Sequence, residues 1–207
     1  RIIVNVCGRS ASDYVEVVEK LADQPVDMLE INVSCPNVKH GGIAFGQDPK
    51  CLFDITREIK AKAKQPIIMK LSPNVTDITE MAKAAEAAGS DAISLINTIT
   101  GMKIDVHKRT FALANKTGGL SGPAIKPVAV RMVYQAANAV KIPIIGMGGI
   151  ANAEDAIEFM LAGATGVAVG AMNFVNPYTT AEIVKGIEEY MRQYAIENLS
   201  DLIGTVV

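Results

Sequence analysis

Short runs of apolar and β-branched residues recur along the chain, and each is followed by a segment with helical spacing. Most runs are continuous rather than alternating, which is typical of strands buried on both faces of a parallel sheet. The six expected strands are Ile2–Val6, Met28–Ser34, Pro66–Ser72, Ala92–Asn97, Pro143–Gly149 and Gly166–Met172.

Apolar positions three and four residues apart predict one helix after each strand. The first such stripe is Tyr14, Val17, Val18 and Leu21, and five comparable stripes follow. Asp48-Pro49 predicts a helix start, while Gly89 and Gly163 stand where helices need a C-terminal stop. We therefore expect six strand-helix units.

Strict alternation of strand and helix predicts a parallel α/β sheet, either open and doubly wound or closed as a barrel. Periodicity does not choose between the two. An eightfold barrel takes about 250 residues, so six units in 207 residues fall two short. Since Arg1 opens directly on a strand, we expect residues 1–207 to be one domain that lacks an N-terminal segment. The long connections Pro36–Asp48 and Thr98–Gly122 are expected to be lids or binding loops.

Composition narrows the range of partners. The chain has 20 Lys and Arg against 22 Asp and Glu, with no basic cluster. We therefore expect no nucleic acid and no anionic membrane surface, and a small molecule or another protein instead. No apolar run approaches 18 residues and the first residues do not resemble a signal peptide, so the expected compartment is the cytoplasm.

The cysteines and histidines do not have the spacing of a metal site or a disulfide framework. Cys7 and Cys51 are interpreted as structural residues. His40 and His107 lie in the two long connections and are too few for a metal centre, so no metal is expected.

Polar residues gather where the second expected strand ends. Asn32 and Ser34 share one face of that strand, and Cys35 falls at the turn that Pro36 imposes. A thiol at this place is either a base or nucleophile under a glycine-bearing loop, or a small buried hydrophobe. The residues alone leave both interpretations open.

Lys70 is a lone charge inside an apolar strand. Burying an unpaired ammonium is costly, so the side chain should meet an anion, an electron-rich cofactor or an ion-pair partner at the barrel bottom. Asn97 and Thr98 end the next strand with two hydrogen-bonding side chains, although Asn-Thr alone is an ordinary turn sequence.

Two glycine turns close the last two strands. Gly146–Ile150 and Gly166–Met172 place bare N–H groups where barrels commonly bind phosphate. Tight turns alone would also explain the glycines. The spacing differs from the dinucleotide-binding fingerprint.

These residues together resemble the dihydroorotate dehydrogenase family over essentially the whole chain, nearest to its class 1B catalytic subunits. The most specific match runs from Ile31 to Gly42 and continues from Ala44 to Pro49. Further matches, all in family order, are the Lys70 strand, Asn97-Thr98, Gly118–Ala124, Gly148-Gly149 and Gly170-Ala171.

The resemblance implies a TIM (β/α)8 barrel that binds FMN and oxidises dihydroorotate to orotate in pyrimidine biosynthesis. It implies that Cys35 is the base at C5 while hydride leaves C6 for flavin N5, and that Lys70 lies beside the flavin. Substrate would bind Asn32, Asn97 and Thr98. The FMN site implied by the family comprises Asn5, Asn32, Lys70, Ile96, Gly122, Gly148, Gly149, Gly170 and Ala171.

The class 1B pattern implies a partner subunit that carries FAD and a 2Fe-2S cluster and passes electrons to NAD, with a homodimer inside a heterotetramer. The family's first two strand-helix units have no counterpart in this chain, so we expect isolated residues 1–207 to be poorly active. Three alternatives remain: a dihydropyrimidine dehydrogenase-like flavin domain, a phosphate-binding barrel aldolase or isomerase, and a cofactor-free folding or assembly module.

Overall fold

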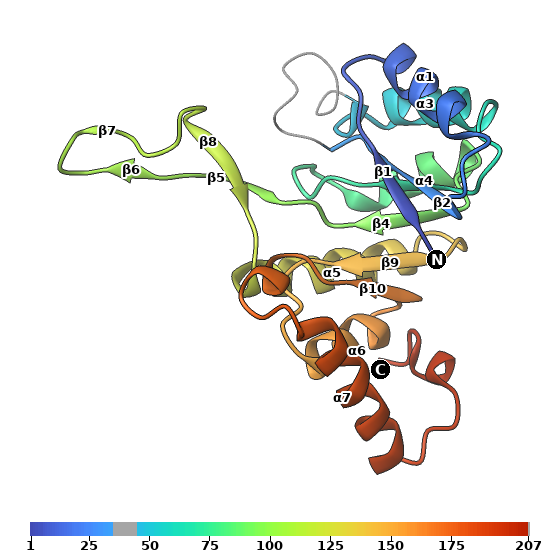
Figure 1. Cartoon of the computed structure of the whole chain (residues 1–207), viewed down its shortest axis with the longest axis vertical. Coiled ribbons are helices and arrows are strands. Elements are labelled where there is room, and N and C mark those ends of the chain that lie inside the picture. Colours follow the sequence, from blue (N-terminus) through green and yellow to red (C-terminus); the bar gives the residue numbers. More distant parts are fainter. Residues whose placement is uncertain (35–44, 207) are drawn as a thin grey trace.

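The computed structural model describes residues 1–34 and 45–206, and a parallel six-stranded sheet forms its centre (Figure 1). The strands stand in chain order, each hydrogen-bonded to the next. They are β1 (Ile3–Val6), β2 (Met28–Asn32), β3 (Ile67–Lys70), β4 (Ala92–Leu95), β9 (Ile144–Met147) and β10 (Gly166–Ala168). All six expected strands are confirmed, and most end earlier than the apolar runs do.

One helix follows each strand, as predicted, and each helix packs against the next along the chain. The helices are α1 (Ala11–Leu21), α3 (Pro49–Lys60), α4 (Ile78–Ala87), α5 (Lys126–Ala137), α6 (Ala153–Leu161) and α7 (Thr179–Gln193). Three short 3-10 turns are η1 (Pro123–Ile125), η2 (Ala171–Phe174) and η3 (Leu199–Leu202).

Local sequence fixes several helix ends. Asp48 accepts a hydrogen bond from the backbone N–H of Cys51 at 2.7 Å, and Pro49 is the first residue of α3. Gly89 and Gly163 follow α4 and α6 with φ of +95° and +111°, a conformation that other residues adopt only with strain. The predicted start and stops are confirmed.

The core lies between the sheet and its helices. Ile31, Met69 and Ile93 come from three neighbouring strands and are fully buried, as is Phe159 on α6. The sheet curls, and among the described residues no backbone pairing joins β1 to β10. Sequential parallel strands with one helix each give the α/β, TIM-like fold that the sequence predicted, here as a curled open sheet.

Residues 98–122 contain secondary structure that the sequence analysis did not predict. Strand β5 (Ile99–Met102) pairs with β8 (Thr117–Leu120), and β6 (Ile104–Asp105) pairs with β7 (Thr110–Phe111), both antiparallel. Figure 1 shows this arm extending away from the central sheet. The other long connection, 36–48, lies outside the described residues as far as position 44.

A charged cluster ties α5 to α6 behind the loop that follows β9. Lys126 Nζ lies 2.7 Å from Asp155 Oδ1 and 2.6 Å from Glu158 Oε2. Asp155 also accepts the backbone N–H of Ala151 at 2.8 Å. Desolvation raises the pKa of this buried carboxyl, but the Lys126 and Ala151 hydrogen bonds outweigh it, so the pKa lies below its ordinary value of 3.8. Hydrogen bonds from Asp155 and Glu158 raise the pKa of Lys126 above 10.5.

We predict that Asp155→Asn lowers the free energy of unfolding by about 2 kcal/mol near neutral pH, because it breaks a charge-assisted hydrogen bond at a buried site. Since the folded-state pKa of Asp155 is depressed, this contribution is present above the unfolded pKa of 3.8 and is lost as pH falls through the lower folded value. Urea unfolding of the wild type and of Asp155→Asn, measured from about pH 3 to about pH 8, tests this prediction.

The matched control is Glu158→Gln. Glu158 binds the same ammonium but its side chain is 47% exposed, so we expect a loss below about 1 kcal/mol. Equal losses for the two variants, or an Asp155→Asn loss that persists undiminished in acid, would contradict the prediction.

Candidate functional site

A cavity of about 560 Å³ opens at the carboxyl ends of the strands. Its walls contain nine of the residues that the sequence analysis assigned to cofactor or substrate. They are Lys70, Ile96, Asn97, Thr98, Gly122, Gly148, Gly149, Gly170 and Ala171. Glu30, Ile145, Met147 and Phe174 also line it, none of which was predicted. Residues as far apart in the chain as Lys70 and Ala171 thus line the same cavity.

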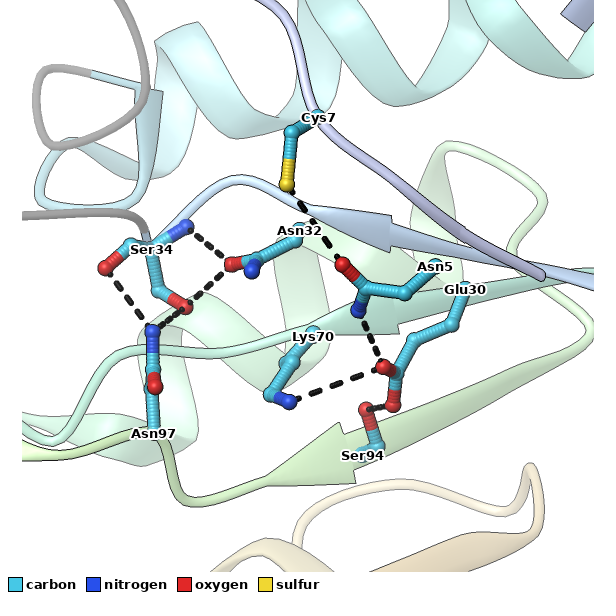
Figure 2. A network of polar contacts seen from close by, with 8 residues as sticks. All are labelled: Asn5, Cys7, Glu30, Asn32, Ser34, Lys70, Ser94 and Asn97. Carbon is cyan, nitrogen blue, oxygen red and sulfur yellow. Dashed lines mark hydrogen bonds and ion pairs between the residues drawn. The ribbon is translucent and has the colours of Figure 1, made fainter. Parts of the chain in front are cut away.

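The remaining predicted residues have different positions. Asn5 and Asn32 do not line this cavity but belong to polar groups that adjoin it (Figure 2). Cys35, the predicted base, comes directly after Ser34 in the chain and lies outside the described residues. His40 lies outside them too.

Three glycines form one wall with backbone geometry that side chains would disturb. Gly122, Gly148 and Gly149 have φ of +91°, +123° and +85°. A Cβ on Gly149 would lie 2.9 Å from both the Gly122 carbonyl oxygen and the Lys126 backbone nitrogen. A Cβ on Gly122 would meet nothing within 4 Å, so only its φ favours glycine. Because all three turns are bare, their backbone reaches the cavity without side chains in between, which suits a phosphate group.

A charged layer lies deeper, on the concave face of the sheet. Lys70 Nζ is 3.5 Å from Glu30 Oε2, with side-chain exposures of 17% and 13%. Glu30 also accepts hydrogen bonds from Asn5 Nδ2 at 2.5 Å and Ser94 Oγ at 2.7 Å. Lys70 therefore has an ion-pair partner on a neighbouring strand and also lines the cavity. Sequence analysis missed Glu30, although a lone acid in an apolar strand is the same signal that singled out Lys70.

A second polar group lies nearer the ends of the strands, and Ser34 is its centre (Figure 2). Asn32 Oδ1 accepts hydrogen bonds from Ser34 Oγ at 2.9 Å and Ser34 N at 3.2 Å. Asn97 Nδ2 donates to Ser34 Oγ at 2.7 Å and to its carbonyl oxygen at 3.0 Å. Ser34 thereby orients both amides: Asn32 keeps its NH2 donors and Asn97 its carbonyl acceptor for a ligand.

Thr98 is held from two sides. Asn74 Nδ2 donates to the Thr98 carbonyl oxygen at 3.1 Å, while Asn74 Oδ1 accepts the Thr100 N–H at 2.9 Å. On the other side Gly119 approaches so closely that an added Cβ would lie 2.2 Å from Thr98 Oγ1. Asn74 has a fold-dependent role that no sequence pattern indicated.

The other cysteines and histidine are away from the cavity. Cys51 is exposed in the first turn of α3, and Cys7 is exposed and donates to Asn5 Oδ1 at 3.4 Å. His107 is exposed between β6 and β7. Within residues 1–34 and 45–206, His, Cys, Asp and Glu form no group of three or more with metal-binding geometry. Over the same residues, no helix has the length and apolarity to cross a membrane.

Comparison with known sequences gives consistent matches. The family model described as dihydroorotate dehydrogenase matches residues 1–191. The chain is 70% identical over 206 residues to "Dihydroorotate dehydrogenase B (NAD(+)), catalytic subunit" of Lachnoclostridium phytofermentans, covering all of this chain and 69% of that protein. It is 63% identical to the protein of the same name from Alkaliphilus oremlandii, covering 99% of this chain and 68% of the relative.

A solved structure supports the fold. The dihydroorotate dehydrogenase of Eimeria tenella in complex with ferulenol superposes with a TM-score of 0.79 at 24% identity, over 94% of this chain and 57% of the other. The present chain therefore spans just over two thirds of its sequence relatives and somewhat over half of this structural neighbour. On the family match and on identities of 60% and above, the chain belongs to the dihydroorotate dehydrogenase family, among its B-type, NAD(+)-linked catalytic subunits.

Proposed function

We propose that this chain forms the FMN-binding and catalytic part of an enzyme that oxidises dihydroorotate to orotate in pyrimidine biosynthesis. The observation that carries the proposal is the single cavity shared by Lys70, the Asn97-Thr98 strand end and the bare glycine turns. The family match favours this function over the aldolase or isomerase and the folding module. Relatives of 60% identity or more named as B-type catalytic subunits favour it over a dihydropyrimidine dehydrogenase.

The residues present fit FMN in size and chemistry. A volume of about 560 Å³ is that of a cofactor pocket. Gly122, Gly148 and Gly149 supply the backbone cradle, and with Gly170 and Ala171 they would hold the ribityl phosphate. Ile96 would pack on the cofactor and Lys70 would lie beside the ring. Asn5 and Asn32 would complete the site from β1 and β2, Asn5 acting through Glu30.

Bound FMN supplies a two-electron acceptor for the hydride that leaves C6 of the substrate. The chain's own residues do the remaining work. Cys35, one residue beyond the Ser34 polar group, takes the C5 proton as the C5–C6 double bond forms. Asn32 offers N–H donors to the substrate's carbonyl and carboxylate oxygens, while Asn97 offers an acceptor to a ring N–H. Thr98 adds a hydroxyl from the cavity wall.

The "catalytic subunit" in the relatives' names supports a partner subunit. We propose that this partner carries FAD and a 2Fe-2S cluster and passes electrons on to NAD, that the catalytic chains pair as a homodimer within a heterotetramer, and that the assembly works in the cytoplasm.

The proposed function predicts flavin reduction in the protein expressed from its complete gene. We expect an absorption band near 450 nm (an approximate figure) that bleaches on anaerobic addition of dihydroorotate. Cys35→Ala should retain the band but bleach about 10²- to 10⁴-fold more slowly, because a positioned base is lost. In the unsubstituted protein the bleaching rate should rise with pH as the thiol ionises.

Cys51→Ala is the matched control, since Cys51 is exposed on α3 away from the cavity. The flavin of this variant should bleach at the wild-type rate. A colourless protein that stays colourless with added FMN would refute the proposed function. A coloured Cys35→Ala protein that bleaches normally would refute only the role of Cys35.

A separate prediction for Thr98 uses two glycines of the β5–β8 pair. Gly119→Ala would place its Cβ 2.2 Å from Thr98 Oγ1 and 2.6 Å from Thr98 Cβ, so the Thr98 side chain must move. We expect KM for dihydroorotate to rise about tenfold, the value of one lost hydrogen bond, with FMN content unchanged.

Gly101→Ala is the control on the facing strand. Its Cβ would meet only Leu120 Cβ at 3.8 Å and the Gly118 carbonyl oxygen at 4.0 Å, both ordinary contacts. We expect steady-state kinetics within about twofold of wild type, since the added methyl displaces nothing. Equal KM values for the two variants would exclude Thr98 from substrate binding.

A further inference from the structure

Glu30 is a carboxylate in the middle of a parallel sheet, where an ionised acid is costly unless it is paired and hydrogen-bonded. Its side chain is 13% exposed, and Figure 2 shows it pointing towards other polar side chains. Three strands provide its partners: Asn5 on β1, Lys70 on β3 and Ser94 on β4. Both oxygens are used, Oε1 by Ser94 and Oε2 by Asn5 and Lys70.

The strand register fixes this arrangement. Asn5 is the β-sheet partner of Glu30, and Lys70 is the partner of Ser94. Between β2 and β3 the register pairs Glu30 with Ile68, so Lys70 lies two residues further along β3 and on the same face of the sheet. The two neutral partners, Asn5 and Ser94, satisfy the carboxylate with hydrogen bonds, while Lys70 supplies a charge.

The Glu30–Lys70 pair is also part of the cavity wall. Both residues line the same cavity as the glycine turns. At 3.5 Å the contact is an ion pair of moderate length, and an ammonium has three N–H donors. Lys70 therefore keeps donors for a ligand while Glu30 balances its charge.

We propose that Glu30 is a positioning residue for Lys70 that sets how much positive charge the bound flavin meets. The inference rests on the proposed function, because it takes the occupant of the cavity to be FMN. With Glu30 ionised the pair is close to neutral, so it stabilises the negative charge of a reduced flavin less than an unpaired ammonium would. Glu30 accordingly lowers the reduction potential of the flavin and favours onward transfer of its electrons.

The test is the two-electron reduction potential of FMN bound to the protein expressed from its complete gene. Glu30→Gln keeps the size and one acceptor oxygen but removes the charge. We expect reduced FMN to gain at least tenfold in affinity relative to oxidised FMN, a positive shift of about 30 mV or more for a two-electron couple. Lys70→Met should shift the potential in the negative direction.

Glu30→Gln is then measured in a protein that also carries Lys70→Met. This double variant separates an effect of Glu30 through Lys70 from a direct effect of Glu30 on the flavin. Without the ammonium, Glu30 has no Lys70 cation to position, so only its direct effect on the flavin is left. Glu30→Gln should then change the potential less than half as much as it does in the presence of Lys70. An equal shift in both backgrounds would overturn the positioning role.

Ser94→Ala is the matched control, because it removes a neutral hydrogen bond to Glu30 and leaves both charges in place. We expect its potential to stay near that of wild type. If Glu30→Gln does not fold, Glu30→Asp replaces it: the charge stays, but the carboxylate is one methylene shorter and withdraws from Lys70, so a smaller positive shift is expected. A Glu30 variant with the same potential as Ser94→Ala would overturn the inference. Failure of the unsubstituted protein to bind FMN would instead overturn the proposed function.

Discussion

Parallel strands bring all their carboxyl ends to one edge of the sheet, and every feature of the candidate site depends on this constraint. The chain leaves β3 at Lys70, β4 at Leu95 and β9 at Met147, and the polar or glycine residues that follow each strand meet around one cavity. Gly122 is an exception, because it reaches the cavity from the end of the long connection that contains β5 and β8. The backbone pairing that builds the core also sets the distances between the site residues, so packing and chemistry are specified by the same register.

This constraint explains why the sequence was informative about the fold. Six apolar runs with helical segments between them leave few arrangements other than sequential parallel strands. The helix boundaries at Asp48 and Gly163 could be predicted because they follow from a capping side chain and a positive φ, both local effects. The β5–β8 arm could not, because its strands are short and Gly118-Gly119 has the composition of a loop. Its pairing depends on contacts between residues that are 15 to 21 positions apart in the chain.

The lining of the cavity was predictable to the same degree and for the same reason. Residues at strand ends were found because their position along the chain gives their position in space. The partners that hold them were not found, since Glu30, Ser34 and Asn74 act across strands or between loops. Ser34 was noted for sharing a face with Asn32, yet its control of two amide orientations depends on Asn97, more than 60 residues away. Sequence shows which groups are available, and the cross-strand register decides how each is oriented.

Two Lys-carboxylate pairs in this chain show how location determines what an ion pair does. Lys126 and Asp155 lie between α5 and α6, and their ammonium and carboxylate approach to 2.7 Å. Neither lines the cavity, and both pKa values are displaced towards the charged forms, so the pair acts on the stability of the loop that carries Gly148 and Gly149. Lys70 and Glu30 approach only to 3.5 Å and both face the cavity. Their separation leaves the ammonium with donors to spare, so a ligand that gains negative charge competes with Glu30 for Lys70. An ammonium and a carboxylate in close contact behind a loop thus support the fold. The same two groups at a longer distance, beside the cavity, leave the ammonium able to bind a ligand there.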